Sequence, residues 1–160
     1  MTGSDLLFSH GSGARRLCGA ALILALIAGL SGCTDRRPAP SGDVYVIRND
    51  GGGQLISAEA DRAMLRLWGG PVQIEGYCNS ACLMFTTLPN ACLAPDLVLG
   101  FHGANVNVGF VGNPQVAKYL RNGVRQKFEE EWQFVPFTEI HRISAAEYVA
   151  LDPETRICAD

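Results

Sequence analysis

Residues 76–82 read GYCNSAC, and this stretch joins a predicted strand to a predicted helix. The strand is the segment 72–74, and the helix is the apolar segment 81–88, which a Pro-Asn pair ends. Ser80 therefore lies at a strand-to-helix corner. Acyl-transfer chemistry needs a hydroxyl nucleophile, a histidine that takes its proton and backbone N–H groups that hold an oxyanion. The chain offers candidates for all three.

Segments on both sides of this corner complete a β-α-β-α-β order. The apolar runs 44–47, 91–94 and 97–101 are typical of short strands, and the cluster Asn49 to Gly53 is expected to end the first of them. A helix is predicted between the strands 44–47 and 72–74, because apolar residues recur there at steps of three and four: Ile56, Ala60, Ala63, Met64 and Leu67. This order predicts an α/β fold with mostly parallel short strands and right-handed crossovers.

The last third of the chain predicts a loop followed by two helices. Residues 103–112 are rich in glycine and asparagine, which is typical of a loop. Asn113 is expected to cap a helix that has Pro114 in its first turn and continues to about Trp132. Residues 144–147, Ser-Ala-Ala-Glu, form a capping-box pattern that predicts a short final helix through residue 151.

The N-terminal segment predicts export. An arginine pair at 15–16 followed by an apolar run at 17–30 is typical of a signal peptide, and the run is too short to cross a bilayer. It ends in Leu-Ser-Gly before Cys33, which resembles a bacterial lipobox and implies acylation of that cysteine. We expect residues 1–32 to be removed, residues 33–42 to form a tether and residues 43–160 to form one domain facing the periplasm or cell exterior. A plain signal peptide is the alternative.

Cysteine content and net charge limit the kinds of site and partner that are expected. Apart from Cys18 and Cys33, the chain has Cys78, Cys82, Cys92 and Cys158, an even number in a compartment that permits disulfides. Two disulfides are expected, with three pairings open. A metal site is disfavoured because no second pair has zinc-ligand spacing, so no metal or other cofactor is expected. The net charge of −3 gives no reason to expect nucleic acid as a partner.

Three segments that follow predicted strands carry the candidate site. In a parallel sheet the carboxyl ends of the strands lie at one edge, so the glycines 51–53, Ser80 and His102 are expected to meet there. Ser80 would be the nucleophile and His102 the general base. The N–H groups of Gly51, Gly52 or Gly53, together with that of Ala81, would bind the oxyanion.

This arrangement resembles the Clp protease/crotonase superfamily, above all its exported Clp-like members, over residues 44–103. The resemblance implies a compact Clp/crotonase-like βαβ spiral, a peptide or protein substrate and a possible homo-oligomer. The chain lacks the family's N-terminal β-α unit and has Asp50 where the family usually has proline. The third triad residue has no clean equivalent: Glu139 is the nearest carboxylate, and Asp152 lies past the last helix. Acyl-CoA chemistry of the crotonase kind is disfavoured because that cofactor is cytosolic.

Simpler roles exist for each candidate. Ser80 could cap the 81–88 helix, His102 could be hydrogen-bonded to a carbonyl, and the glycines could form an ordinary turn. The chain would then be a degenerate Clp-like protein with a binding or assembly role in the envelope. A serine–lysine mechanism is less attractive because Lys118 and Lys127 both lie on a predicted helix. A catalytic cysteine is disfavoured because exported thiols tend to be oxidised.

Overall fold

A computed structural model describes residues 36–105, 107 and 109–159, which belong to one compact unit. The predicted signal peptide, Cys33 and the first residues of the predicted tether lie outside the described residues. Within the described part, no helix has both the length and the apolar character needed to cross a bilayer.

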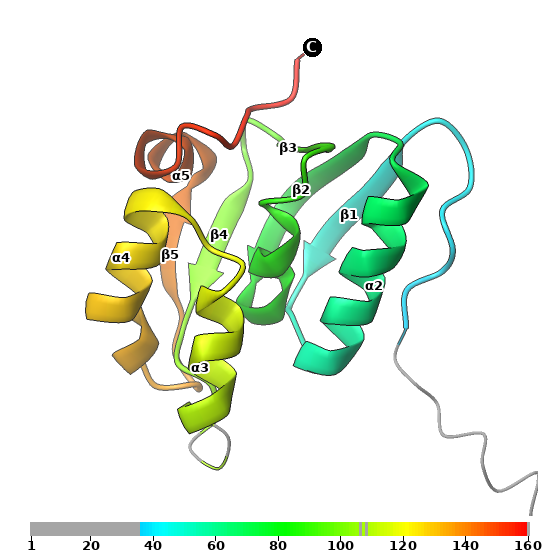
Figure 1. Ribbon diagram of the computed structural model, residues 1–160. Helices are drawn as coiled ribbons and strands as arrows, with labels where there is room; N and C mark the ends of the chain where they lie inside the picture. The colour runs from blue at the N-terminus through cyan, green and yellow to red at the C-terminus, as the bar shows by residue number, and fades with distance from the viewer. Residues whose placement is uncertain (1–35, 106, 108, 160) are drawn as a thin grey trace, which may run out of the picture. The chain divides into compact units, whose positions relative to one another are not determined.

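A five-stranded sheet organises this unit (Figure 1). The strand order is β1-β2-β4-β5, and β3 pairs with the first half of β2. Strands β1, β3 and β4 run parallel to β2, whereas β5 runs antiparallel to β4. The predicted α/β class with mostly parallel strands is therefore confirmed. The strands are β1 (Tyr45–Asp50), β2 (Val72–Asn79), β3 (Ala91–Leu93), β4 (Val98–Phe101) and β5 (His141–Ser144).

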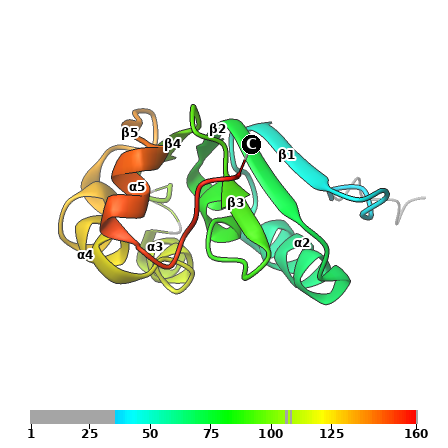
Figure 2. The same ribbon diagram turned by 90° about the horizontal axis from the view of Figure 1, so that it is seen from above.

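Helices α2, α3 and α4 lie on the same side of the sheet (Figure 2). Between them and the strands lies the core, which contains Ile47, Ile74 and Leu99 from the sheet and Leu65 and Phe128 from the helices. The α-helices are α2 (Leu55–Trp68), α3 (Gly109–Ala117), α4 (Asn122–Glu130) and α5 (Ala145–Leu151), and the 3₁₀ helices are η1 (Ser80–Phe85) and η2 (Trp132–Phe134).

Helix α2 is present where periodicity predicted it, but its buried face is a different one. Ile56 and Leu67 are 82% and 88% exposed, whereas Ala58, Asp61 and Leu65 face the core. The buried face contains Asp61, which pairs with Arg36 and Arg37, so this face is not hydrophobic at every position. An apolar periodicity alone therefore selected the wrong side of the helix.

The predicted helix from Asn113 to Trp132 is wrong. The structure has two helices there, and α3 begins before Pro114 and contains it. Asn113 is not a cap, because its Oδ1 accepts a hydrogen bond from the N–H of Ala104 at 2.6 Å. Asn122 has a φ of 49°, and its side chain donates to Asp152 at 2.6 Å. This side-chain contact stabilises the left-handed conformation that asparagine tolerates, and the chain changes direction there.

Three further segments differ from the sequence prediction. Strand β1 continues through Asn49 to Asp50, with a register irregularity at that point, although the Asn-Asp-Gly cluster was expected to end it earlier. The predicted helix 81–88 is a six-residue 3₁₀ helix, as buried as expected. Strand β5 was not predicted, because only Ile143 in its four residues is buried and its pairing with β4 is a tertiary contact.

The chain's C-terminal part is tied to the sheet in two places. Cys158 forms a disulfide with Cys92 of β3, and the N–H of Cys158 donates to Leu93 at 2.8 Å. The predicted capping box at Ser144 is confirmed at the start of α5. Within α5, the hydroxyl of the fully buried Tyr148 lies 2.7 Å from the Thr86 hydroxyl. Burial raises the pKa of Tyr148. Two disulfides are consistent with an exported protein.

Asp152 follows α5 and holds together two parts of the fold. Its carboxylate, which is inaccessible to solvent, accepts hydrogen bonds from Arg121 at 3.0 Å, Asn122 at 2.6 Å and Thr155 at 2.6 Å. Burial by itself raises the pKa of Asp152, but these hydrogen bonds outweigh it and the net pKa lies below the ordinary value of 3.8. The carboxylate therefore has a structural role between α4 and the C-terminal segment.

Because the pKa of Asp152 is lower in the folded state, its stabilisation is present above the unfolded pKa and is lost as pH falls through the folded value. Asp152→Asn should lower the free energy of unfolding by about 2 kcal/mol at pH 7, and the difference from wild type should shrink near pH 3. Urea unfolding of both proteins at pH 7 and near pH 3 measures this difference in the free energy of unfolding. The exposed Asp96→Asn is the control and should stay within about 0.5 kcal/mol. A pH-independent deficit would contradict this role.

Candidate functional site

The carboxyl ends of β1, β2 and β4 lie at one edge of the sheet because these strands are parallel (Figure 1). The glycines 51–53 follow β1, Ser80 follows β2 and His102 follows β4. The three segments that carry the predicted site residues therefore begin at the same edge of the sheet. A cavity of about 620 Å³ is lined by Gly53, Ser80 and His102 among others.

Ser80 adopts a backbone conformation that is unusual for its residue type. Its φ is 55°, in the left-handed region, at the point where β2 becomes η1. The N-cap of η1 is Asn79, without a side-chain cap hydrogen bond, so the structure does not give Ser80 the role of a cap. Residues held in sparsely populated conformations cost about 1–3 kcal/mol and cluster at functional sites. A strained serine between a strand and a helix is also the geometry of a nucleophile elbow.

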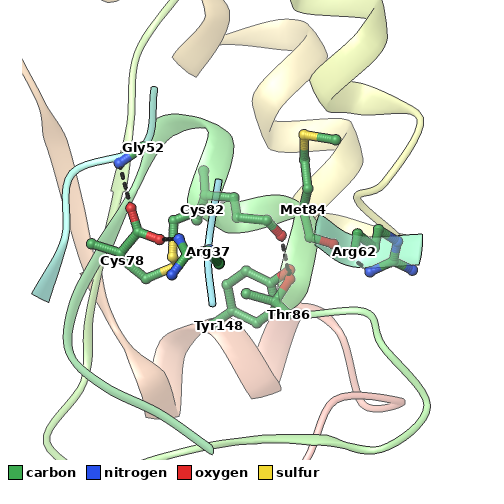
Figure 3. Close-up of a disulfide and its surroundings, with 10 residues drawn as sticks. Arg37, Gly52, Arg62, Cys78, Cys82, Met84, Thr86 and Tyr148 are labelled. Carbon is green, nitrogen blue, oxygen red and sulfur yellow. Dashed lines mark hydrogen bonds and ion pairs between the residues drawn. A yellow bond between two sulfur atoms is a disulfide. The ribbon is translucent and has the colours of Figure 1, made fainter. Parts of the chain in front are cut away.

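The residues on either side of this serine are joined by a disulfide between Cys78 and Cys82, which Figure 3 shows. Cys78, the second-last residue of β2, is bonded to Cys82 in the first turn of η1, and both are buried. The bond closes a five-residue loop with Ser80 at its centre, so the left-handed turn is held from both sides. Since Cys82 is oxidised, it is not a free nucleophile.

Gly52 packs directly against the Ser80 corner. A Cβ atom added to Gly52 would lie 2.7 Å from the Asn79 carbonyl oxygen, 2.8 Å from Ser80 Cβ and 2.9 Å from the Ala81 nitrogen. Its φ of +91° also favours glycine. The N–H of Gly52 donates to Asp50 Oδ1 at 2.8 Å, so this N–H is not free for an oxyanion.

The four proposed oxyanion residues therefore differ in their positions. Gly53 lines the cavity that holds Ser80 and His102, and its N–H donates to no other described residue. Gly51, Gly52 and Ala81 line a second cavity of about 370 Å³ instead. Gly53 lines both cavities, so the glycine loop lies between them. Of the four residues, Gly53 is the best placed to meet a substrate bound beside Ser80.

His102 is half-buried and oriented by the backbone. Its Nδ1 lies 2.6 Å from the carbonyl oxygen of Gly103. A carbonyl only accepts hydrogen bonds, so Nδ1 carries the proton and Nε2 keeps its lone pair as a base. The N–H of Ala104 shares a peptide unit with this carbonyl and donates to Asn113 Oδ1 at 2.6 Å, which holds the carbonyl in place. Ser80 and His102 line the same cavity without a hydrogen bond between them, and catalytic contacts are often long before substrate binds.

The cavity is mainly apolar. Three of its apolar side chains, Ile56, Val111 and Phe137, are 82%, 54% and 47% exposed, so they mark its open side. The remaining apolar side chains of the lining are those of Leu55, Leu83, Ala104, Val116 and Phe128. Such a site accommodates a bulky apolar group more readily than a charged one.

Glu139, the predicted third triad residue, is exposed, and its carboxylate makes no hydrogen bond or ion pair with another described residue. It does not line the cavity, and neither does Asp152. The carboxylate that does line it, Glu59 of α2, was missed by the sequence analysis. Glu59 accepts a hydrogen bond from the Tyr119 hydroxyl at 2.5 Å, and burial together with this contact raises the pKa of Tyr119. Position in sequence offered no signal for Glu59, because it lies within a helix.

Other chemistries find little support at this edge. Lys118 pairs with Glu59 at 3.6 Å and Lys127 with Glu131 at 2.6 Å, and neither lysine lines the cavity. In the part of the chain that the structure describes, no three His, Cys, Asp or Glu side chains converge as metal ligands do. Of the polar groups at the cavity, those that fit acyl transfer are thus the Ser80 hydroxyl, the His102 imidazole and the Gly53 N–H.

The contact between Gly52 and the Ser80 corner can be tested by adding a methyl group. Gly52→Ala should lower the free energy of unfolding by about 3 kcal/mol, because the new Cβ meets backbone atoms that cannot move independently. Gly51→Ala is the matched control, since a Cβ there meets nothing within 4 Å. Its stability should stay within about 0.5 kcal/mol of wild type. Equal effects in denaturant unfolding would show that the packing is looser than described.

Comparison with known proteins adds no assignment to this geometry. No protein-family model matches the chain, and no curated protein matches its sequence.

Proposed function

We propose that this protein is a lipid-anchored serine hydrolase of the cell envelope, peptidase-like in its chemistry, with a Clp/crotonase-like arrangement of its site. One observation carries the proposal: a strained serine and a histidine with a free Nε2 line the same cavity, next to an unused glycine N–H. The lipid anchor at Cys33 rests on the sequence pattern alone.

The reaction would follow the usual order of acyl transfer. Ser80 Oγ attacks the carbonyl carbon of the substrate while His102 Nε2 takes its proton. The oxyanion that forms accepts a hydrogen bond from the Gly53 N–H. The tetrahedral species collapses, the leaving amine or alcohol takes the proton from His102, and an acyl-enzyme remains. Water then attacks this ester, gives a proton to His102, and Ser80 leaves with that proton.

A second function is favoured by two specific observations. The partner of His102 Nδ1 is a carbonyl rather than a carboxylate, and the N–H of Gly52 is occupied by Asp50. A triad without its carboxylate loses about 10⁴-fold in turnover. The alternative is therefore a degenerate member that uses the cavity to bind an apolar ligand or partner in the envelope.

A fluorophosphonate probe separates these two functions. Wild-type protein should be labelled at Ser80, Ser80→Ala should not be labelled, and His102→Ala should be labelled at least about 100-fold more slowly because the general base is lost. Labelling rate and site are measured by mass spectrometry of the intact and digested protein.

Matched controls exist for both variants. Ser57→Ala removes a serine that lines the other cavity, and His141→Ala removes a histidine that stacks on Trp132. Both should be labelled like wild type. Folded wild-type protein that resists the probe would leave the binding function as the better explanation.

The apolar lining also sets a preference for the acyl side of the substrate. The described lining includes one carboxylate, Glu59, and no lysine or arginine, so acidic groups gain no partner there. A bulky apolar group would instead bury its surface against Ile56, Val111 and Phe137, the exposed apolar side chains of the lining. We expect substrates with a large apolar side chain or acyl group next to the bond that is cleaved.

Phosphonate probes of increasing alkyl length test this preference. Labelling of wild-type protein should accelerate with alkyl length, and Phe137→Ser should reduce the long-to-short rate ratio by about tenfold because apolar contact is lost. Phe134→Ser is the control: this phenylalanine is 72% exposed in the same region but does not line the cavity. A rate ratio unaffected by Phe137→Ser would show that the cavity does not hold the apolar group.

A further inference from the structure

Two arginines of the predicted tether contact a buried carboxylate of the domain. Asp61 of α2 is only 2% exposed, and its Oδ1 accepts a hydrogen bond from Arg36 Nε at 3.3 Å. Its Oδ2 accepts one from the backbone N–H of Arg37 at 3.2 Å, and Arg37 Nε lies 3.8 Å away. A buried carboxylate without a cation is strongly unfavourable, so this pairing fastens residues 36 and 37 to α2.

Arg37 also reaches the end of β1. Its Nη2 forms an ion pair with Asp50 Oδ2, while Asp50 Oδ1 accepts the hydrogen bond from the Gly52 N–H (Figure 3). The same guanidinium lies 4.8 Å from the centre of the Phe85 ring in η1. A planar guanidinium can serve several partners at once, which an ammonium cannot do equally well. Arg37 thereby joins α2, the end of β1 and η1.

The glycine loop has few other contacts that could hold it. A Cβ added to Gly51 or Gly53 would meet nothing within 4 Å, and the loop has a cavity on each side. Gly52 alone is packed, and it is packed against the Ser80 corner. The Asp50 carboxylate is thus the polar anchor of the loop. Without a cation beside it, this carboxylate would gain more from turning toward water than from holding the loop.

We propose that Arg37 is a positioning residue of the site, which acts through Asp50 to hold the Gly51–Gly53 loop against Ser80. Residues 36 and 37 then belong to the folded domain rather than to a free spacer. The effect on catalysis rests on the hydrolase function proposed above, whereas the effect on the loop does not. The positive charge that completes the site comes from outside the sheet and helices that form it.

The full chain with Arg37→Ala tests this relay by two measurements. Amide hydrogen exchange of the Gly52 N–H should become about tenfold faster, because its hydrogen bond to a held carboxylate is lost. Fluorophosphonate labelling of Ser80 should become about tenfold slower for the same reason. Arg37→Lys keeps a cation near Asp50, so its exchange rate and its labelling rate should both lie between those of Arg37→Ala and wild type.

Two further variants separate the relay from general docking of the segment. Arg36→Ala is the matched control, since Arg36 contacts Asp61 but not Asp50, and both measurements should stay near wild type. In the double variant Arg37→Ala/Asp50→Asn the effects should not add, because both residues act on one hydrogen bond.

The outcomes are distinct. Faster exchange in Arg37→Ala, with wild-type protein that resists the probe, would support the positioning role and reject the hydrolase. The relay would be overturned if the amide exchange rate of Arg37→Ala equals that of wild type, or if Arg36→Ala and Arg37→Ala have equal effects. Either result would count even if Ser80 is labelled. If Arg37→Ala does not fold, Arg37→Lys and Asp50→Asn carry the same comparison.

Discussion

The contact between Gly52 and the Ser80 corner is the constraint on which the site depends. Atoms from the end of β1 and the end of β2 meet there at distances that leave no room for a side chain at residue 52. Ser80 and Gly52 both have a positive φ, and their backbones pack against each other at this contact. His102 joins them from β4 through the parallel order of the strands, and its ring is held by a backbone carbonyl. Ser80, His102 and Gly53 thus line one cavity.

The sequence predicted the α/β class, the strand-end position of these residues and the capping box at Ser144. These features follow from local rules: glycines break strands, apolar runs form them, and parallel strands bring their ends together. The meeting of Ser80 and His102 needed no more than these rules. Cysteine count and export context predicted two disulfides but left three pairings open, and the structure selects Cys78–Cys82 and Cys92–Cys158.

The features that the sequence could not predict depend on tertiary contacts. Asp61 is buried on the face of α2 that periodicity assigned to solvent, because arginines from another segment neutralise it. The break between α3 and α4 depends on a side-chain bond from Asn122 to Asp152, which lies 30 residues away. Glu59 lines the cavity from within a helix, and Glu139 does not, although its position shortly before the last helix suggested it. Local propensity contains no information about such partners.

The disulfide around Ser80 also bears on when the proposed hydrolase could become active. A bond between Cys78 and Cys82 forms in an oxidising compartment and stays open among the reductants of the cytosol. In an exported chain, the turn that presents the hydroxyl is therefore fixed by the disulfide only after the chain leaves the cytosol. If the hydrolase proposed above is correct, a chain still in the cytosol would lack this covalent restraint on its serine and would be less able to act on cytosolic proteins.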